Sequence, residues 1–150
     1  MKDDIATLKT ILSRSHTIAF VGLSASWNRP SFFAAKYMQE HGYKIIPVNP
    51  KYGVKSQKIL GEVCYSSLLE IPIQVDIVDV FRRTEDVLPF AKQAVEIRAS
   101  CLWQQLGVRN KIATRLISEA GLVCIEDRCV KIEHARIFGG LNWVGVNTGI

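Results

Sequence analysis

At residues 17–31 the chain reads Thr17-Ile18-Ala19-Phe20-Val21-Gly22-Leu23-Ser24-Ala25-Ser26-Trp27-Asn28-Arg29-Pro30-Ser31. An apolar run ends at Gly22, small polar residues follow, and Pro30 opens a segment of helical periodicity that continues to His41. This pattern predicts a strand, a loop of a size to hold a phosphate group, and a helix. The first N–H groups of a helix have no internal partner and lie at the positive end of the helix dipole, so they favour an anion.

Three residues of this stretch suit an anion site. Gly22 adopts backbone angles that other residues resist, which lets a ligand approach the main chain. Pro30 fits the first turn of a helix, and Arg29, held extended by that proline, can offer a forked cationic contact to a phosphate. The loop lacks the G-x-G-x-x-G fingerprint of dinucleotide-binding proteins, so an ordinary strand-to-helix turn without a ligand stays open as the alternative.

The rest of the chain alternates between apolar runs and segments of helical periodicity. The expected strands lie at about 16–22, 43–51, 75–81, 100–103 and 122–126. The expected helices lie at about 4–14, 30–41, 66–70, 84–98, 110–120 and 130–136. This alternation predicts a single α/β domain over residues 1–150, with a Rossmann-like, doubly wound parallel sheet of about five strands in the order 3-2-1-4-5. In such a sheet, ligands bind outside the carboxyl ends of the strands, where the strand order reverses.

The composition narrows the class of protein. With 150 residues, 48% hydrophobic and 22% charged, the chain suits one globular domain. The net charge of +5 favours a polyanionic partner, but the basic residues are scattered, so we expect a small phosphorylated ligand and no nucleic acid. No apolar run approaches the roughly 20 residues of a membrane helix, and the first residues are too polar for a secretory signal. We therefore expect a cytoplasmic protein without a membrane partner.

The four cysteines, Cys64, Cys101, Cys124 and Cys129, contain no C-x-x-C pair. The usual spacing of a structural zinc site is therefore missing, and no metal site is predicted. Reduced thiols are the expectation for a cytoplasmic protein, with Cys101 and Cys124 buried in apolar runs.

The residues that follow the strands discriminate among nucleotide ligands. An NAD site places a carboxylate after the second strand, but this chain has Lys51 there, which would attract a phosphate on the ribose, as in NADP or coenzyme A (CoA). Phe81 and Arg82 follow the third strand, where the ring could lie against the ligand and the guanidinium could reach a pyrophosphate. Trp103 ends the fourth strand and is expected either as an apolar wall of the pocket or as core. A solvated surface lysine is the alternative for Lys51.

The order of several motifs carries a resemblance to a known family. The motifs are Gly22-Leu23-Ser24 with Arg29-Pro30-Ser31, residues 42–50, Asp76-Ile77-Val78-Asp79-Val80-Phe81-Arg82, residues 103–108, and Asp127-Arg128-Cys129 with His134. From about residue 15 to 140 the chain resembles the small stand-alone CoA-binding proteins, which are similar to the CoA-binding domain of the succinyl-CoA synthetase α subunit. The resemblance implies CoA or acyl-CoA as the ligand, held by the first loop, the first helix and the next strand ends.

The resemblance also implies a set of binding residues. The motifs carry over Gly22, Ser24, Arg29, Ser31, Asn49, Lys51, Phe81 and Arg82, and Leu23, Ser26, Pro50 and Trp103 complete the predicted set. The larger synthetases carry their phosphorylated histidine outside this domain, and none of the histidines here, His16, His41 and His134, falls in a counterpart of that segment. We therefore expect a protein that binds CoA without catalysis of its own.

Other interpretations stay open. An NADP-dependent oxidoreductase or a nucleotide-binding regulatory module would share Lys51, and a nucleic-acid-binding module would use the positive charge. Cys129 and His134 could form a nucleophile and base, although five positions are awkward for one helix face. The apolar segment Leu141–Val146 is expected to cover this domain or a partner, so a homo-oligomer or a protein partner is possible.

Overall fold

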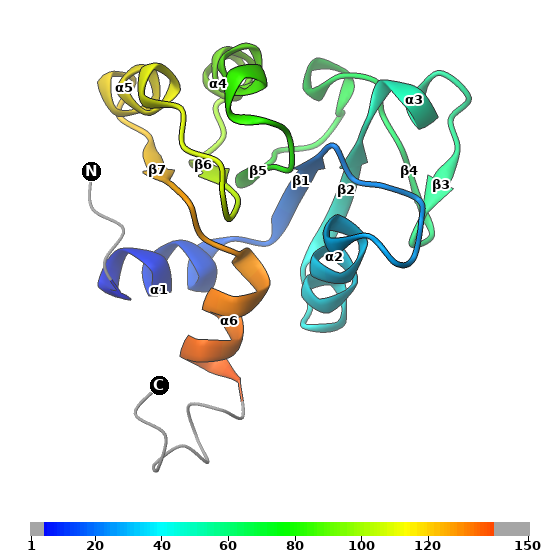
Figure 1. Ribbon diagram of the computed structural model, residues 1–150, viewed down its shortest axis with the longest axis horizontal. Coiled ribbons are helices and arrows are strands. Elements are labelled where there is room, and N and C mark those ends of the chain that lie inside the picture. Colours follow the sequence, from blue (N-terminus) through cyan, green and yellow to red (C-terminus); the bar gives the residue numbers. More distant parts are fainter. Residues whose placement is uncertain (1–4, 140–150) are drawn as a thin grey trace.

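The computed structural model describes residues 5–139, in which five strands form one parallel sheet (Figure 1). Along the sheet these strands are β2 (Lys44–Val48), β1 (Thr17–Val21), β5 (Ile77–Val80), β6 (Cys101–Gln104) and β7 (Val123–Ile125). All four strand pairings are parallel. The Rossmann-like α/β fold expected from the sequence is confirmed. The apolar segment 141–146 lies outside the described residues.

The predicted strand order, 3-2-1-4-5, differs from the observed one. Counted along the chain, the sheet strands run 2-1-3-4-5, because β5 pairs with β1, with Ile18 beside Ile77 and Val21 beside Val80. Pro47 in β2 has no N–H to donate to a neighbouring strand, which disfavours a further strand along the outer edge of β2. Its carbonyl instead accepts the N–H of Tyr65 at 3.0 Å. The strand order therefore reverses between β1 and β5, and the residues after these two strands become neighbours.

Helices cover both faces of the sheet (Figure 1). One face packs against α1 (Ile5–Arg14), α2 (Pro30–Glu40) and α6 (Val130–Phe138), and the other packs against α4 (Val87–Glu96) and α5 (Lys111–Glu119). Strand β1 shows why both faces need cover: Ile18 and Phe20 point to the first group of helices, and Ala19 and Val21 to the second. Successive strand side chains alternate between faces, so a sheet that is apolar on both sides must be buried on both.

The connection between β2 and β5 holds more structure than the sequence indicated. It contains α3 (Pro50–Gly53), a hairpin of β3 (Lys58–Ile59) and β4 (Glu62–Val63), and the 3₁₀ turn η1 (Leu68–Glu70). Strands of two residues are too short to show a periodicity, so the hairpin could not be predicted. The short helix expected near residue 66 is confirmed as η1.

Two helix starts differ in how they are capped. Asn110 caps α5, since its Oδ1 accepts the N–H of Ala113 at 2.9 Å. The helix expected from Thr84 begins as a 3₁₀ turn, η2 (Thr84–Asp86), before α4. The Thr84 hydroxyl does not cap this helix but accepts the N–H of Arg109 at 3.2 Å, which ties two strand-end loops together.

Between Ile5 and Phe138, none of the helices has the length and apolar character that crossing a lipid bilayer requires.

Candidate functional site

The loops after β1 and β5 meet at Gly22. Its φ of +88° is the left-handed conformation, and a Cβ built on it would lie 2.5 Å from the carbonyl oxygen of Phe81 and 3.0 Å from Cδ of Arg82. The Gly22 N–H donates to the carbonyl of Val48 at 2.8 Å, so the loop is also attached to β2. Only glycine satisfies both the backbone angle and the available space.

The β1–α2 loop, residues 22–29, leads directly into a helix without a side-chain cap. Arg29 occupies the N-cap position of α2 and makes no capping hydrogen bond, and Pro30 follows in the first turn. The serine hydroxyls of the loop brace its own backbone: Ser31 Oγ accepts from Ser24 N at 3.1 Å, and Ser24 Oγ accepts from Ser26 N at 3.0 Å. The loop is therefore ordered by internal bonds. Phe32 N–H and Phe33 N–H both donate to the Arg29 carbonyl, at 3.0 and 3.2 Å, and Pro30 has no N–H, so this end of α2 offers an anion the Ser31 N–H and the positive end of the helix dipole.

A cavity of about 480 Å³ opens at this point. It is lined by the strand-end residues Gly22, Arg29, Phe81, Arg82, Arg83, Asp86, Gln105, Leu106 and Val108. Four of the predicted site residues, Gly22, Arg29, Phe81 and Arg82, are brought together here. The predicted set lacked the other five, and their only signal was that they follow predicted strands.

The charges of the cavity are predominantly positive. Its lining holds three arginines and one carboxylate, and Asp86 Oδ2 accepts from Arg82 Nη2 at 3.4 Å and from Arg83 Nε at 3.2 Å. The hydrogen bond from Arg83 lowers the pKa of Asp86, so this carboxylate stays charged and holds both guanidinium groups at the cavity. Arg29 is the cavity's remaining cation. Together these groups are suited to a ligand with more than one negative charge.

The far wall of the cavity comes from the loop after β6. Leu106 is 64% exposed there, while the neighbouring Gln105 is buried and its Oε1 accepts the N–H of Val130 at 3.1 Å. Trp103, predicted as a possible pocket wall, is fully buried on the face covered by α6 and does not line this cavity. Its Nε1 donates to the carbonyl of Arg128 at 2.8 Å. Of the two positions expected for Trp103, the pocket wall and the core, the structure therefore shows the core.

Three more of the predicted residues, Asn49, Pro50 and Lys51, lie at the end of β2, whereas the side chain of Leu23 is fully buried in the core. Asn49 caps α3 through Oδ1, which accepts from Lys51 N at 3.0 Å, and its Nδ2 donates to the carbonyl of Leu23 at 3.2 Å. Pro50 is the first residue of α3, and the exposed Lys51 places Nζ 5.4 Å from the ring centroid of Tyr52. This β2-end group and the cavity thus lie on opposite sides of the same loop.

Tyr52 is a residue of this group that the sequence did not indicate. The polar groups near its hydroxyl, the Ser24 side chain first and then the Ala25 backbone, lower the pKa of the phenol. No motif identifies such a tyrosine, because its contacts join segments that lie far apart in the sequence.

Cys129 and His134 do not form a nucleophile–base pair in the described part of the chain. Cys129 holds the N-cap position of α6, while His134 lies inside the helix and is buried against α2. The Nδ1 of His134 is hydrogen-bonded to the hydroxyl of Tyr37 at 3.0 Å. Burial and the nearby His41 lower the pKa of His134.

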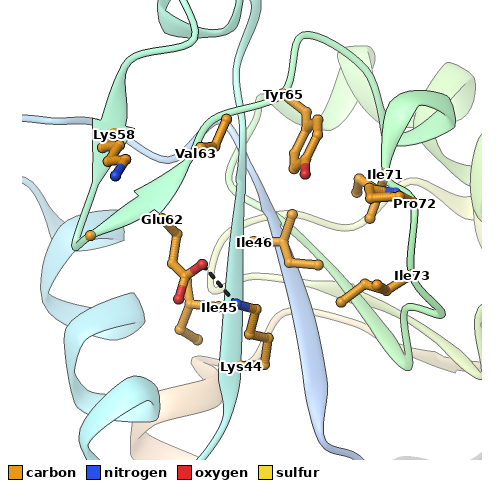
Figure 2. Close-up of a pocket in the computed structure, with 11 residues that line it drawn as sticks. Lys44, Ile45, Ile46, Lys58, Glu62, Val63, Tyr65, Ile71, Pro72 and Ile73 are labelled. Carbon is orange, nitrogen blue, oxygen red and sulfur yellow. Dashed lines mark hydrogen bonds and ion pairs between the residues drawn. The ribbon is translucent and has the colours of Figure 1, made fainter.

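A second cavity, of about 250 Å³, lies along the outer edge of β2 (Figure 2). Ile46, Tyr65, Ile71 and Ile73 form its walls, and an ion pair of 2.8 Å joins Lys44 to Glu62 across its side. None of the predicted site residues lines it. Within residues 5–139, no group of three or more His, Cys, Asp or Glu side chains is arranged to hold a metal ion.

The chain is similar to proteins of known sequence and structure. The chain is 43% identical over 130 residues to the uncharacterized protein YneT of Bacillus subtilis, covering 87% of this chain and 93% of that protein. A hypothetical protein from Pyrococcus horikoshii has a solved structure that matches with a TM-score of 0.85 at 36% identity, covering 91% of this chain and 93% of that one.

A larger enzyme contains a related segment. The chain is 32% identical over 98 residues to the ADP-forming acetate–CoA ligase II of Archaeoglobus fulgidus. The matched segment covers 64% of this chain but only 13% of the ligase. The family model described as the CoA binding domain matches residues 16–135. That match includes all five sheet strands and both sides of the site. The chain therefore belongs to the CoA-binding-domain family.

Proposed function

We propose that this chain binds CoA or acyl-CoA outside the carboxyl ends of β1, β2 and β5. One observation carries the proposal: the uncapped N-terminus of α2 opens beside a cavity in which Gly22 lies against Phe81 and three arginines converge. A pyrophosphate combines several negative charges with oxygens that accept from backbone N–H groups. It is therefore the kind of group that this arrangement favours.

The two sides of the β1–α2 loop suit different parts of such a ligand. On the β2 side, Lys51 and Asn49 would contact the nucleotide, with Lys51 close to a phosphate on the ribose. On the other side, Phe81 and Leu106 would contact the apolar pantetheine arm, and the amide of Gln105 is fixed at the base of that wall. Phe81 is itself supported from below, since its ring stacks on Phe20 at 5.8 Å between centroids.

We limit the proposal to binding. The described residues that line the cavity offer guanidinium, amide and paired carboxylate groups, but no histidine, cysteine, serine or threonine. His16 precedes β1 and His41 ends α2, so both lie at the opposite end of the sheet from the cavity.

A ligand-dependent shift in thermal stability tests the proposal. A ligand that binds only the native state adds about 2.7 kcal/mol when present at 100 times its dissociation constant. We expect millimolar CoA or acetyl-CoA to raise the melting temperature and NADPH to have little effect. A shift with NADPH alone would favour the dinucleotide alternative, and no shift with any of the three would contradict the proposal.

A further inference from the structure

Asp127 joins the two loops that follow β6 and β7, which lie side by side at the carboxyl ends of these strands (Figure 1). Its Oδ1 accepts the N–H of Gly107 at 2.7 Å, and its Oδ2 accepts from Arg109 Nη2 at 3.3 Å. The Asp127 N–H adds a third bond, to the carbonyl of Val108 at 3.1 Å. One residue of the β7–α6 loop therefore holds three successive residues of the β6–α5 loop.

The backbone of Asp127 has the left-handed conformation, with a φ of +53°. Aspartate and asparagine adopt this conformation more readily than most other residues with a side chain, but it persists only where the surrounding contacts stabilise it. The side-chain bonds to Gly107 and Arg109 are such contacts. The side chain and the backbone of Asp127 thus hold the same loop together.

The loop that Asp127 holds is the far wall of the strand-end cavity. Leu106 and Val108 line that cavity, and Leu106 is 64% exposed. An exposed leucine is not fixed by burial, so its position depends on the backbone that carries it. Asp127 holds this backbone from the β7 side, and Thr84 Oγ1 holds it from the β5 side by accepting the N–H of Arg109 at 3.2 Å.

From these contacts we infer that Asp127 is a positioning residue, which holds Leu106 in place for the pantetheine arm of the ligand through its bond to Gly107. The inference rests on the proposed function, in which Leu106 contacts that arm, and it adds the residue that orders this wall. Asp127 is not among the residues that line the cavity, so it acts through the β6–α5 loop. It should therefore affect recognition of the arm and leave recognition of the nucleotide almost unchanged.

The ligand pair for the test is CoA and 3′-phosphoadenosine 5′-diphosphate, which is CoA without its pantetheine arm. Asp127→Gly removes the side chain and permits the left-handed backbone without strain. We expect calorimetry to show CoA binding about tenfold weaker, as when the wall takes its binding conformation only about a tenth of the time. Binding of the arm-free nucleotide should change less than about twofold. The loss of a negative charge would by itself strengthen binding of both anions, so it cannot produce this result.

Two further variants make the result specific. Asp127→Asn keeps an oxygen that can accept from Gly107 and tolerates the left-handed backbone, while Arg109 keeps Glu126, whose Oε1 lies 3.8 Å from its Nε. This variant should bind CoA within about twofold of the wild type. Arg98→Gly is the matched control, because Arg98 is exposed, has a φ of +58° and precedes β6 at the opposite end of the sheet. It should change neither affinity.

Hydrogen exchange at the Gly107 amide gives a readout that does not depend on the second ligand. The N–H of Gly107 donates to Asp127 Oδ1, so without ligand it should exchange about tenfold faster or more in Asp127→Gly than in the wild type. In Asp127→Asn the exchange should stay close to the wild-type rate. Addition of CoA should slow it in Asp127→Gly, because the bound arm orders the wall.

The possible outcomes separate the inference from the proposed function. An equal loss for both ligands in Asp127→Gly would show that Asp127 merely supports the fold, and an unchanged CoA affinity would show no role. A CoA loss in Asp127→Asn as large as in Asp127→Gly, or a Gly107 amide that exchanges at the wild-type rate in Asp127→Gly, would show that the bond to Gly107 does not hold the wall. Each of these results overturns the inference while CoA binding stands. Wild-type protein that does not bind CoA would contradict the proposed function and this inference with it.

Discussion

Gly22 and Phe81 lie in direct backbone contact, with only 2.5 Å between the Phe81 carbonyl oxygen and the place where a Cβ on Gly22 would be. The contact exists because β1 and β5 are adjacent in the sheet and both loops turn at the same height. It brings the loop that precedes α2 against Arg82, and so it creates the cavity at which we place the ligand.

Gly22→Ala should therefore damage both stability and binding. The methyl group meets backbone atoms that cannot rotate away, and the φ of +88° adds strain, so we expect a loss of about 2–4 kcal/mol in unfolding free energy, measured by urea titration. Gly42→Ala is the matched control: its φ is +95° but nothing lies within 4 Å of the added Cβ. It should cost only the strain, about 1 kcal/mol. Equal costs for the two variants would contradict the close contact.

Removing the charge of Arg82 should weaken CoA binding without unfolding the protein. Arg82→Gln keeps much of the side chain but loses a charge-assisted contact to phosphate, so we expect affinity to fall about tenfold or more by calorimetry. The difference from the wild type should shrink as salt rises. The exposed Arg115 on α5 lies outside the cavity lining, and Arg115→Gln should bind as the wild type does. A comparable loss in both variants would indicate a nonspecific effect of net charge.

Asp79 should make the protein less stable as pH rises. It is fully buried in β5 and neither carboxylate oxygen has a hydrogen-bond partner among residues 5–139, so burial raises its pKa well above the ordinary 3.8. The folded state then holds a proton that the unfolded state releases, and stability falls as pH rises from about 3.8 through the folded-state pKa. Asp79→Asn removes this dependence. The unfolding free energy of both proteins is measured by urea titration at pH 4.5 and pH 7.5. Relative to the wild type, the variant should be more stable at pH 7.5 than at pH 4.5, whereas a difference that does not change with pH would contradict a buried titrating carboxyl.

His134 should have the opposite pH dependence. Its ring contacts Tyr37, His41 and Tyr43, and burial, with a contribution from His41, lowers its pKa below 6.5. The unfolded state therefore takes up a proton first, and stability is lost as pH falls from about 6.5 to the folded-state pKa. An NMR titration of the ring protons should give His134 a pKa below the ordinary histidine value. A pKa at or above 6.5 would mean that α6 does not pack on α2 as described.

The local features of the site could be predicted from the sequence better than its arrangement. The strand, loop and helix around Gly22 follow from apolar periodicity and from the proline at residue 30, and the structure places them as expected. The strand order did not follow, because pairing is decided by contacts between distant segments. Pro47 was the one local signal that β2 is an edge strand.

Two residues show the limits of reading a site from strand ends. Trp103 is the third of the four residues of β6, and the alternation of the strand turns its ring into the core under α6, whereas the exposed Leu106 lies in the loop beyond the strand end. Tyr52 follows the lysine that the sequence did identify, but the pKa of its phenol is lowered mainly by Ser24, which lies 28 positions earlier in the chain. This proximity is visible only once β1 and β2 are paired.

The most direct test of the account is a crystal structure of the chain with CoA bound. The account predicts the pyrophosphate at the first turn of α2, within hydrogen-bonding distance of the Ser31 N–H and of Arg29 or Arg82, with the ribose phosphate toward Lys51. CoA bound elsewhere, for example in the cavity beside Ile46 at the β2 edge, would contradict it.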